Sequence, residues 1–485
     1  MKNYFWACGV AAGVLVLLAG CRSASAPASV ATPWSPPRAA QATEKTWQEI
    51  RARQPDFPKP QSLAELADLA LQNNPATRKA WNDARVAAAQ VAQARGYFLP
   101  TLTAAGNVSR ARTDANPDTL SSDYLQYGPA LQLNYLIINF GGGRSAAVEQ
   151  ALQTVYAANF TFNRTLQAVL LAVQNAYFGV VSAQAGLEAA QAQVQDAQTA
   201  LEAAKLRQAN GVGNELEVLQ AQALADQALL GQASAEGALK TAQSALTQAL
   251  GIPADAPVKV IAPTNDLPVA PDTQHLSQLI DEALQRRPDI AALRARLAAS
   301  EAAITVAGAQ QWPNLYATGR ASRDYNERWS GQFQPDNDWS YAGGLSLQWT
   351  FFDGLQTINA KRAAQAQAES VRSQLQQAEL AASAEVWNGH QTYATALKKF
   401  QFSGAALRSS QAAYDLALDS YKAGLKSILD LLGAESQLAQ ARSQHIAARQ
   451  EAFTALANLA FVSGSLEKDN LDRPTGATPM EKGKL

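Results

Sequence analysis

Two hydrophobic periodicities alternate along the chain, and they predict long strands and very long helices. Apolar residues occupy every second position at 131–137 and 345–351, and they alternate with Gln132 and Asn134 in the first segment and with Ser346, Gln348 and Thr350 in the second. This alternation is typical of a strand with one apolar and one polar face. A second expected strand precedes each segment, so we predict two β-hairpins, at about 101–138 and about 314–352.

After each hairpin the sequence continues without proline at 145–209 and 355–423. Helices of roughly 65 residues or more would be on the order of 100 Å long at a rise of 1.5 Å per residue. Each expected helix ends at a glycine turn and is followed by a returning helix, which predicts coiled-coil hairpins at about 145–250 and about 355–463. Steps of three and four residues predict their seams at Ala183, Leu187, Ala190, Val194, Ala197, Leu201 and Ala204, and at Ala406, Ser409, Ala413, Leu416, Ser420 and Ala423.

The whole pattern occurs twice, in one register. Pro75 matches Pro288 (288 − 75 = 213), and Gly211 matches Gly424 at the same offset. A fixed offset held over so many positions indicates an internal duplication. The expected parts after the N-terminal region are a first repeat at 61–250, a Pro-rich linker at 251–274, a second repeat at 275–464 and a polar C-terminal tail at 465–485.

The N-terminus has the pattern of a secretory signal. Lys2 precedes the short apolar run at 11–19, which is too short for a membrane-spanning helix and predicts a signal peptide at 1–20. The run ends in Leu-Ala-Gly-Cys, the pattern of a bacterial lipobox, whose cysteine is acylated after cleavage. We therefore expect Cys21 to be a lipid anchor, followed by an extended N-terminal segment at 21–60; a plain secretory signal with an incidental cysteine is the alternative.

Charge and composition argue against several functions. The formal net charge is −1, which gives no basic field for nucleic acid. The three histidines have no acidic or Cys companion at metal-ligand spacing, and neither a nucleophile–base pattern nor a nucleotide-binding fingerprint accompanies a suitable fold. We expect no metal centre, no cofactor, no nucleic-acid partner and no catalysis.

Four amphipathic strands cannot close a barrel within one chain. Open strand edges are too costly in lipid, and the smallest membrane barrels have about eight strands. Closure therefore requires oligomerisation, and three copies would give a twelve-stranded barrel with the long helices as a tube. Tyr135, Trp349 and Phe351 are expected on the apolar, membrane-facing side.

The duplicated order of helices, hairpin, long helix, turn and returning helix resembles the TolC family of outer-membrane efflux proteins, in its lipoprotein branch. The motifs that carry the resemblance are RRPDI at 286–290, NFGGGR at 139–144, WTFFDG at 349–354 and GLKSILDLL at 424–432. The resemblance implies a mixed α and β membrane protein, in which coiled-coil hairpins form an α-barrel and four transmembrane strands per protomer complete the trimeric β-barrel. It covers nearly the whole expected mature chain.

The resemblance also implies the function and its partners. A homotrimer, lipid-anchored in the outer membrane, would be the exit duct of a tripartite efflux system for small molecules such as drugs or metal ions. Its helical barrel would lie in the periplasm and meet a periplasmic adaptor protein and an inner-membrane pump, most simply a proton-driven one. The rival interpretations are the outer-membrane protein of a type I secretion system and a non-conducting coiled-coil lipoprotein that tethers the envelope.

The resemblance places the candidate functional residues at the periplasmic tip. The turns Gly211-Val212-Gly213 and Gly424-Leu425 would contact the adaptor. The gate candidates are Asp430, its duplicate Glu217, Lys426 and Gly433; the last stands where some relatives carry a second Asp. For the two acids, the alternative is a solvated carboxylate favoured by the helix dipole, by about 0.3–1 kcal/mol.

Overall fold

The computed structural model describes Gln48 and residues 57, 59–113, 122–263, 276–328 and 339–466. The chain divides into two units, 1–56 and 57–485, and all of the elements below belong to the second. The expected signal peptide, its lipobox and Cys21 lie outside the described residues. So do the tips of both strand hairpins and most of the expected C-terminal tail.

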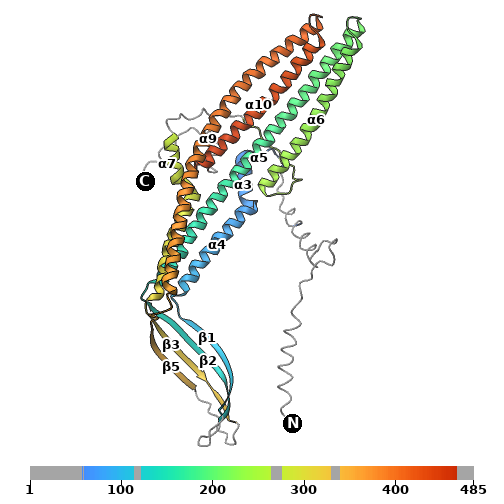
Figure 1. Ribbon diagram of the computed structural model, residues 1–485. Coiled ribbons are helices and arrows are strands. Elements are labelled where there is room, and N and C mark those ends of the chain that lie inside the picture. Colours follow the sequence, from blue (N-terminus) through green and yellow to red (C-terminus); the bar gives the residue numbers. More distant parts are fainter. Residues whose placement is uncertain are drawn as a thin grey trace, which may run out of the picture. The chain divides into compact units, whose positions relative to one another are not determined.

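The same series of elements appears twice (Figure 1). The first series is α3 (Leu63–Asn73), α4 (Pro75–Gly96), β1 (Thr101–Thr113), β2 (Ser122–Asn139), α5 (Gly143–Ala209) and α6 (Glu215–Leu250). The second is α7 (Leu276–Arg286), α8 (Pro288–Gly308), the short 3-10 helix η2 (Ala309–Gln311), β3 (Asn314–Arg323), β4 (Tyr325–Arg328), β5 (Trp339–Gln348), α9 (Gln356–Lys422) and α10 (Ile428–Val462). The expected mixed fold with long helical hairpins and four long strands is confirmed.

The strands form one antiparallel sheet in the order β1-β2-β3-β5. The short β4 continues β3 along β2, because its pairing keeps the same register. The interruption between them faces Gly128 and Pro129 of β2. Pro129 has no N–H to donate to a ladder. A Cβ on Gly128 would lie 1.9 Å from the carbonyl oxygen of Arg323, so only glycine allows this close approach.

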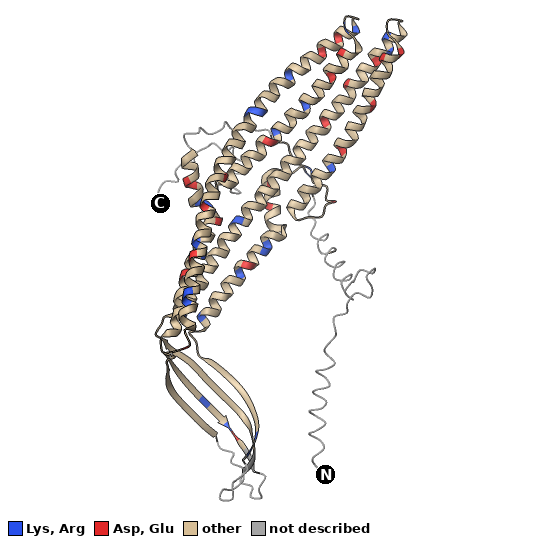
Figure 2. Cartoon of the chain, viewed as in Figure 1, with Lys and Arg blue, Asp and Glu red and all other residues tan. Residues whose placement is uncertain are grey.

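Strand alternation gives the sheet one apolar and one polar face. Leu345 and Leu347 lie on the apolar face and are 71% and 65% exposed in the single chain. Gln132 and Arg320 are paired on the opposite face. Few charged residues lie on the strands, whereas both signs are spread along the helices (Figure 2).

Trp349 and Phe351 lie beyond the strand on which they were expected. β5 ends at Gln348, because the chain turns there toward α9. The indole N–H of Trp349 donates to the carbonyl of Gln311 at 3.0 Å, which ties this turn to the end of η2. Tyr135 does lie within β2, opposite Ala317 of β3.

Arg144 fastens the first strand-to-helix junction. Its guanidinium donates to the carbonyls of Leu136 at 2.5 Å and Ile137 at 2.9 Å, where the β2–β3 register shifts by a bulge. It also lies over the ring of Phe98, 4.6 Å from the centroid. It thereby satisfies backbone carbonyls that the bulge leaves without ladder partners.

Alanine-rich helix faces make the core near the hairpin ends. Ala197, Ala200 and Ala204 of α5 are almost completely buried, together with Tyr421 of α9 and Leu431 of α10. Small side chains let these backbones approach closely.

An 18-residue window of α5 is apolar enough to cross a membrane by length and composition, yet half of it is buried inside the protein. It therefore reads as a core helix.

The beginning of the expected linker is part of the core. Ile252 and Val258 are buried against α5, and the backbone at Val260 forms a parallel bridge with Gln61. Burial of these side chains anchors the entry and exit of the first repeat. Extended proline-containing backbone can therefore pack as tightly as a regular element.

The expected seam of α9 is wrong by about one position. Ala406, Ser409, Ala413 and Leu416 are exposed, and Leu416 is 69% exposed. The buried positions are instead Tyr414 and Tyr421, with Leu407 and Leu418 partly buried beside them. The expectation followed the small residues, whereas the two large tyrosines, which bury more apolar area, face the neighbouring helices.

Candidate functional site

The ends of the two helical hairpins, here called the tips, are built alike. At each tip the glycine after the long helix, Gly211 or Gly424, has a left-handed φ of +71° or +76°. The Val212 N–H donates to the Arg207 carbonyl at 3.0 Å, and the Leu425 N–H donates to the Ser420 carbonyl at 2.9 Å. These are Schellman turns, which need glycine because a Cβ is disfavoured at such a φ.

The returning helices also begin alike but diverge in one contact. Asn214 caps the N–H of Glu217 at 2.9 Å, and Ser427 caps the N–H of Asp430 at 3.2 Å. Asp430 returns the bond by accepting from the Ser427 N–H at 3.1 Å, which completes a capping box. The side chain of Glu217 instead extends to the other hairpin, where its carboxylate bonds Tyr421.

Glu217 joins the first hairpin to the second. Its carboxylate accepts a hydrogen bond of 2.8 Å from the hydroxyl of Tyr421, which is completely buried. Arg207 completes the cluster, since it donates to the Tyr421 carbonyl at 2.9 Å and lies 4.7 Å above that ring. Its Nε is 3.8 Å from Glu217, an ion pair too long for a hydrogen bond. Burial, and then the bond to Glu217, raise the pKa of Tyr421 to about 12.

Asp430, Lys426 and Gly433 are exposed at the second tip. Hydrogen bonds from Ser427 lower the pKa of Asp430, and the charge of Lys426 acts in the same direction. Asp430 is therefore an anion at neutral pH. A Cβ at Gly433 would meet nothing within 4 Å, so a side chain could be placed there. The structure places Asp430 and Glu217 on different hairpins, in different bonding states.

A second polar cluster lies below the tips, where α5, α9 and α10 meet. Arg442 of α10 pairs with Asp196 of α5 at 2.7 Å and donates to Gln411 of α9 at 3.0 Å. The hydroxyl of Tyr414 donates to the Asp196 carbonyl at 3.3 Å. Glu435 lies within the same core and is 1% exposed. This cluster is the second polar link between the two hairpins.

A third cluster fixes α8 to α9, far from the tips. Arg287 is 4% exposed and bonds Asp289 at 2.7 Å and Glu385 at 2.6 Å. Arg164 of α5 lies 3.7 Å from Asp289. Burial alone would lower the pKa of Arg287, but the hydrogen bonds that it donates to the two carboxylates raise it overall. The RRPDI motif thus has a structural role here.

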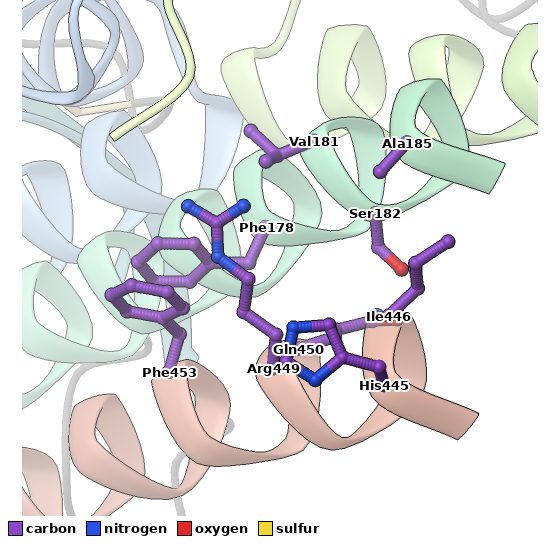
Figure 3. Close-up of a pocket in the computed structure, with 9 residues that line it drawn as sticks. All are labelled: Phe178, Val181, Ser182, Ala185, His445, Ile446, Arg449, Gln450 and Phe453. Carbon is purple, nitrogen blue, oxygen red and sulfur yellow. The ribbon is translucent and has the colours of Figure 1, made fainter. Parts of the chain in front are cut away.

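A small cavity lies between α5 and α10 (Figure 3). Its volume is about 80 Å³, and the stacked rings of Phe178 and Phe453 form one wall, with centroids 4.8 Å apart. His445 and Arg449 line it from α10. Pockets for drug-sized ligands measure about 300–1,000 Å³. This cavity therefore belongs to helix packing rather than to a cargo site.

Sequence reasoning missed Arg207, Tyr421 and Glu435. Arg207 and Tyr421 lie within one turn of the glycines that were recognised, so their position was a usable signal. Glu435 lies between Leu431 and Leu438 at steps of four and three, which puts a carboxylate on an apolar stripe. A charge on the buried face of an amphipathic helix is uncommon and signals a special role.

Comparison with protein families gives a match in both repeats. The family described as outer membrane efflux protein matches residues 66–252 and 279–465. The two matched segments cover both helical hairpins and both strand hairpins. Each of the two repeats therefore matches the family separately.

Individual proteins give the same result. The chain is 30% identical over 422 residues to the protein CyaE of Bordetella pertussis, which covers 87% of each chain. It is 26% identical over 418 residues to the toluene efflux pump outer membrane protein TtgC of Pseudomonas putida, covering 82% of each. The solved structure of the outer-membrane channel OprN has the same fold, with a TM-score of 0.72 at 22% identity, over 86% of this chain and 95% of that one.

Proposed function

The chain belongs to the outer membrane efflux protein family, and from this premise we propose that it forms the homotrimeric exit duct of a tripartite efflux system. It is an outer-membrane efflux channel; the proposal concerns its assembly, partners, anchor, gate and cargo. The strands would cross the outer membrane, and the helical hairpins would line a tube in the periplasm.

The observation that carries the proposal is the open sheet. Among the described strands, β1 and β5 each pair on one side, so both edges offer unpaired backbone groups. The sheet also exposes its apolar face. Unpaired backbone in hydrocarbon costs several kcal/mol per group, so edges pair with neighbouring copies until the barrel closes. Three copies of four long strands meet that requirement.

Exposed apolar side chains on the helices support the same assembly. Leu380, Trp387 and Phe402 of α9 are 73%, 53% and 68% exposed in the single chain. Such residues on a long helix mark a surface that another chain covers. In the proposed trimer they pack between protomers and close the α-barrel.

The tips are the proposed contact with the periplasmic adaptor. Val212 and Leu425 are 66% and 79% exposed at the ends of the hairpins, beside Gly211, Gly213 and Gly424. An adaptor would pack on these turns and connect the duct to an inner-membrane pump, which we propose to be proton-driven. The proposed cargo is small molecules such as drugs or metal ions.

The proposed gate is the set of tip contacts. The bond between Glu217 and Tyr421 holds the hairpins together, and opening requires it to break. Asp430 would contribute one carboxylate per protomer to a ring near the pore axis, with Lys426 beside it. Because Gly433 has no side chain, a second acidic ring is not expected.

Cys21 is the proposed lipid anchor. Each acyl methylene buried in a bilayer contributes about 0.8 kcal/mol, so several acyl chains would hold the chain firmly to the outer membrane. A Cys21→Ala variant should lose the lipid mass while the β-barrel remains in the membrane.

Native mass spectrometry of protein extracted from membranes tests the assembly, and planar-bilayer conductance tests the duct. The expected result is a trimer of acylated chains that begin at Cys21 and conduct ions. A monomer under gentle extraction would leave both sheet edges open and overturn the proposal. A trimer without conductance would favour the tethering scaffold.

A further inference from the structure

Glu435 is a carboxylate enclosed by its own chain. It is 1% exposed, and neither carboxylate oxygen has a hydrogen-bond partner among the described residues. Leu431 and Leu438 flank it on the same face of α10 and are completely buried. A neighbouring copy cannot bring a cation to Glu435 without rearrangement, because the single chain already covers it.

The charged and titratable groups around Glu435 do not neutralise it. From α5 it faces Asp196, and from α9 it faces the phenol of Tyr414. Arg442 is the cation of its own helix, but this guanidinium is bonded to Asp196 and Gln411. From α6, this core receives the buried side chains of Ala221, Ala225 and Ala228, with Val218 and Leu224 partly buried beside them.

An ionised carboxylate in such surroundings is costly. Burial first and the charge of Asp196 second raise the pKa of Glu435 to about 7, and the charge of Arg442 acts in the opposite direction. Separation of α10 from α5 would admit water and return the carboxyl to its ordinary behaviour. The proton affinity of Glu435 therefore depends on whether the two hairpins are packed together.

We propose that Glu435 is a proton-binding site that seals the tips: the closed seam between α5 and α10 retains the proton, and opening releases it to water. This inference rests on the proposed function for the statement that the tips open. It goes beyond that function by adding a ligand, the proton, and a direction of control.

The direction of the pH effect on opening is set by which state binds the proton more tightly. The closed state has the higher pKa, about 7, and the open state has the ordinary value of 4.5. Because the closed state binds the proton more tightly, acidification favours closure. In each protomer, the ratio of the open to the closed state should fall about tenfold per pH unit on acidification between these two values, roughly 300-fold in all. Above about pH 7 the ratio should level off.

The test is the pH dependence of open probability. Full-length protein is reconstituted in planar bilayers, and openings are recorded from pH 5 to 8. Wild type should open less at each step below pH 7. Glu435→Gln, which has the same shape and no charge at any pH, should give a flat profile at the low, acid level. Glu202→Gln on the exposed face of α5 is the matched control and should keep the wild-type profile.

The outcomes separate the two proposals. A wild-type profile without pH dependence, or one that survives Glu435→Gln, overturns the proton site while the duct stands. If wild type conducts at no pH, the duct fails, and hydrogen exchange then decides the proton site. Exchange in α10 peptides near Glu435, corrected for the intrinsic pH effect, should slow on acidification from pH 7.5 to 5.5 in wild type only. Equal slowing in Glu435→Gln overturns the inference.

Discussion

The hydroxyl of Tyr421 donates to the carboxylate of Glu217 at 2.8 Å, so one side chain from each hairpin ties the two tips together. The duplicate of Glu217, Asp430, makes no such tie, because it bonds back to its own N-cap, Ser427. Two equivalent positions of the duplication have thus taken different roles. One links the hairpins, and the other caps a helix.

Removal of this tie should loosen the tips. A hydrogen bond to a charged acceptor contributes about 1.5–3 kcal/mol, so Tyr421→Phe should raise the open probability at least about tenfold. Planar-bilayer recording measures the change. Tyr156→Phe is the control, since Tyr156 is 44% exposed, away from the tip turns. An unchanged open probability in Tyr421→Phe would remove this bond from the gate.

The proposed ring of Asp430 carboxylates should bind divalent cations. Asp430→Asn should relieve block of the conductance by millimolar Mg²⁺ or Ca²⁺, and Gly433→Asp, placed in open space, should strengthen it. Ser427→Ala is the control, because it removes the cap and leaves the carboxylate. If divalent cations block the wild type and the three variants equally, Asp430 does not bind them and serves only to cap α10.

The same carboxylate should make the α10 start sensitive to strong acid. Hydrogen bonds from Ser427 lower the pKa of Asp430 below its ordinary 3.8. Its contribution is therefore present above about pH 4 and is lost as pH falls through the lowered value. After correction for the intrinsic pH effect, amides in the peptides at the start of α10 should exchange faster below pH 4 than at pH 6 in the wild type. Asp430→Asn should lack this acid step.

Arg287 should be the more important of two adjacent arginines for stability. It is buried and bonded to two carboxylates, so Arg287→Met should destabilise the protein by about 1.5–3 kcal/mol, since it removes charged hydrogen bonds to two partly exposed carboxylates. Arg286 pairs with Glu282 on the surface, with 58% of its side chain exposed. Arg286→Met should cost about 0.5 kcal/mol or less. Thermal unfolding in detergent compares the two, and equal shifts would contradict the structural role of Arg287.

The two faces of β5 should respond oppositely to charge. Leu345→Arg places a cation on the apolar face and should cost about 2–4 kcal/mol near the bilayer midplane. Ser346→Arg, one residue further, places it on the polar face and should be tolerated. Folding into lipid vesicles measures both. If the Ser346 variant were the more damaged, the assignment of the lipid-facing side would be reversed.

Local patterns in the sequence are enough to predict the elements and their duplication. A period of two, a proline-free run and a left-handed glycine are local properties, so the strands, the long helices and the turns at Gly211 and Gly424 could be predicted from neighbouring residues. The structure moves these bounds by only a few residues. Trp349 is an exception, because the end of β5 is decided by the turn into α9.

Which side chains meet depends instead on how the helices pack in three dimensions. The seam of α9 lies on Tyr414 and Tyr421 because the shape of the opposing helices selects the buried face, and periodicity leaves that choice open to within one position. Glu217 and Asp430 occupy equivalent positions of the two repeats, yet among the described residues only Glu217 bonds a tyrosine from the other hairpin. The burial of Glu435 likewise depends on three helices from both repeats. Contacts between residues some 200 positions apart are set by packing geometry, which no local pattern encodes.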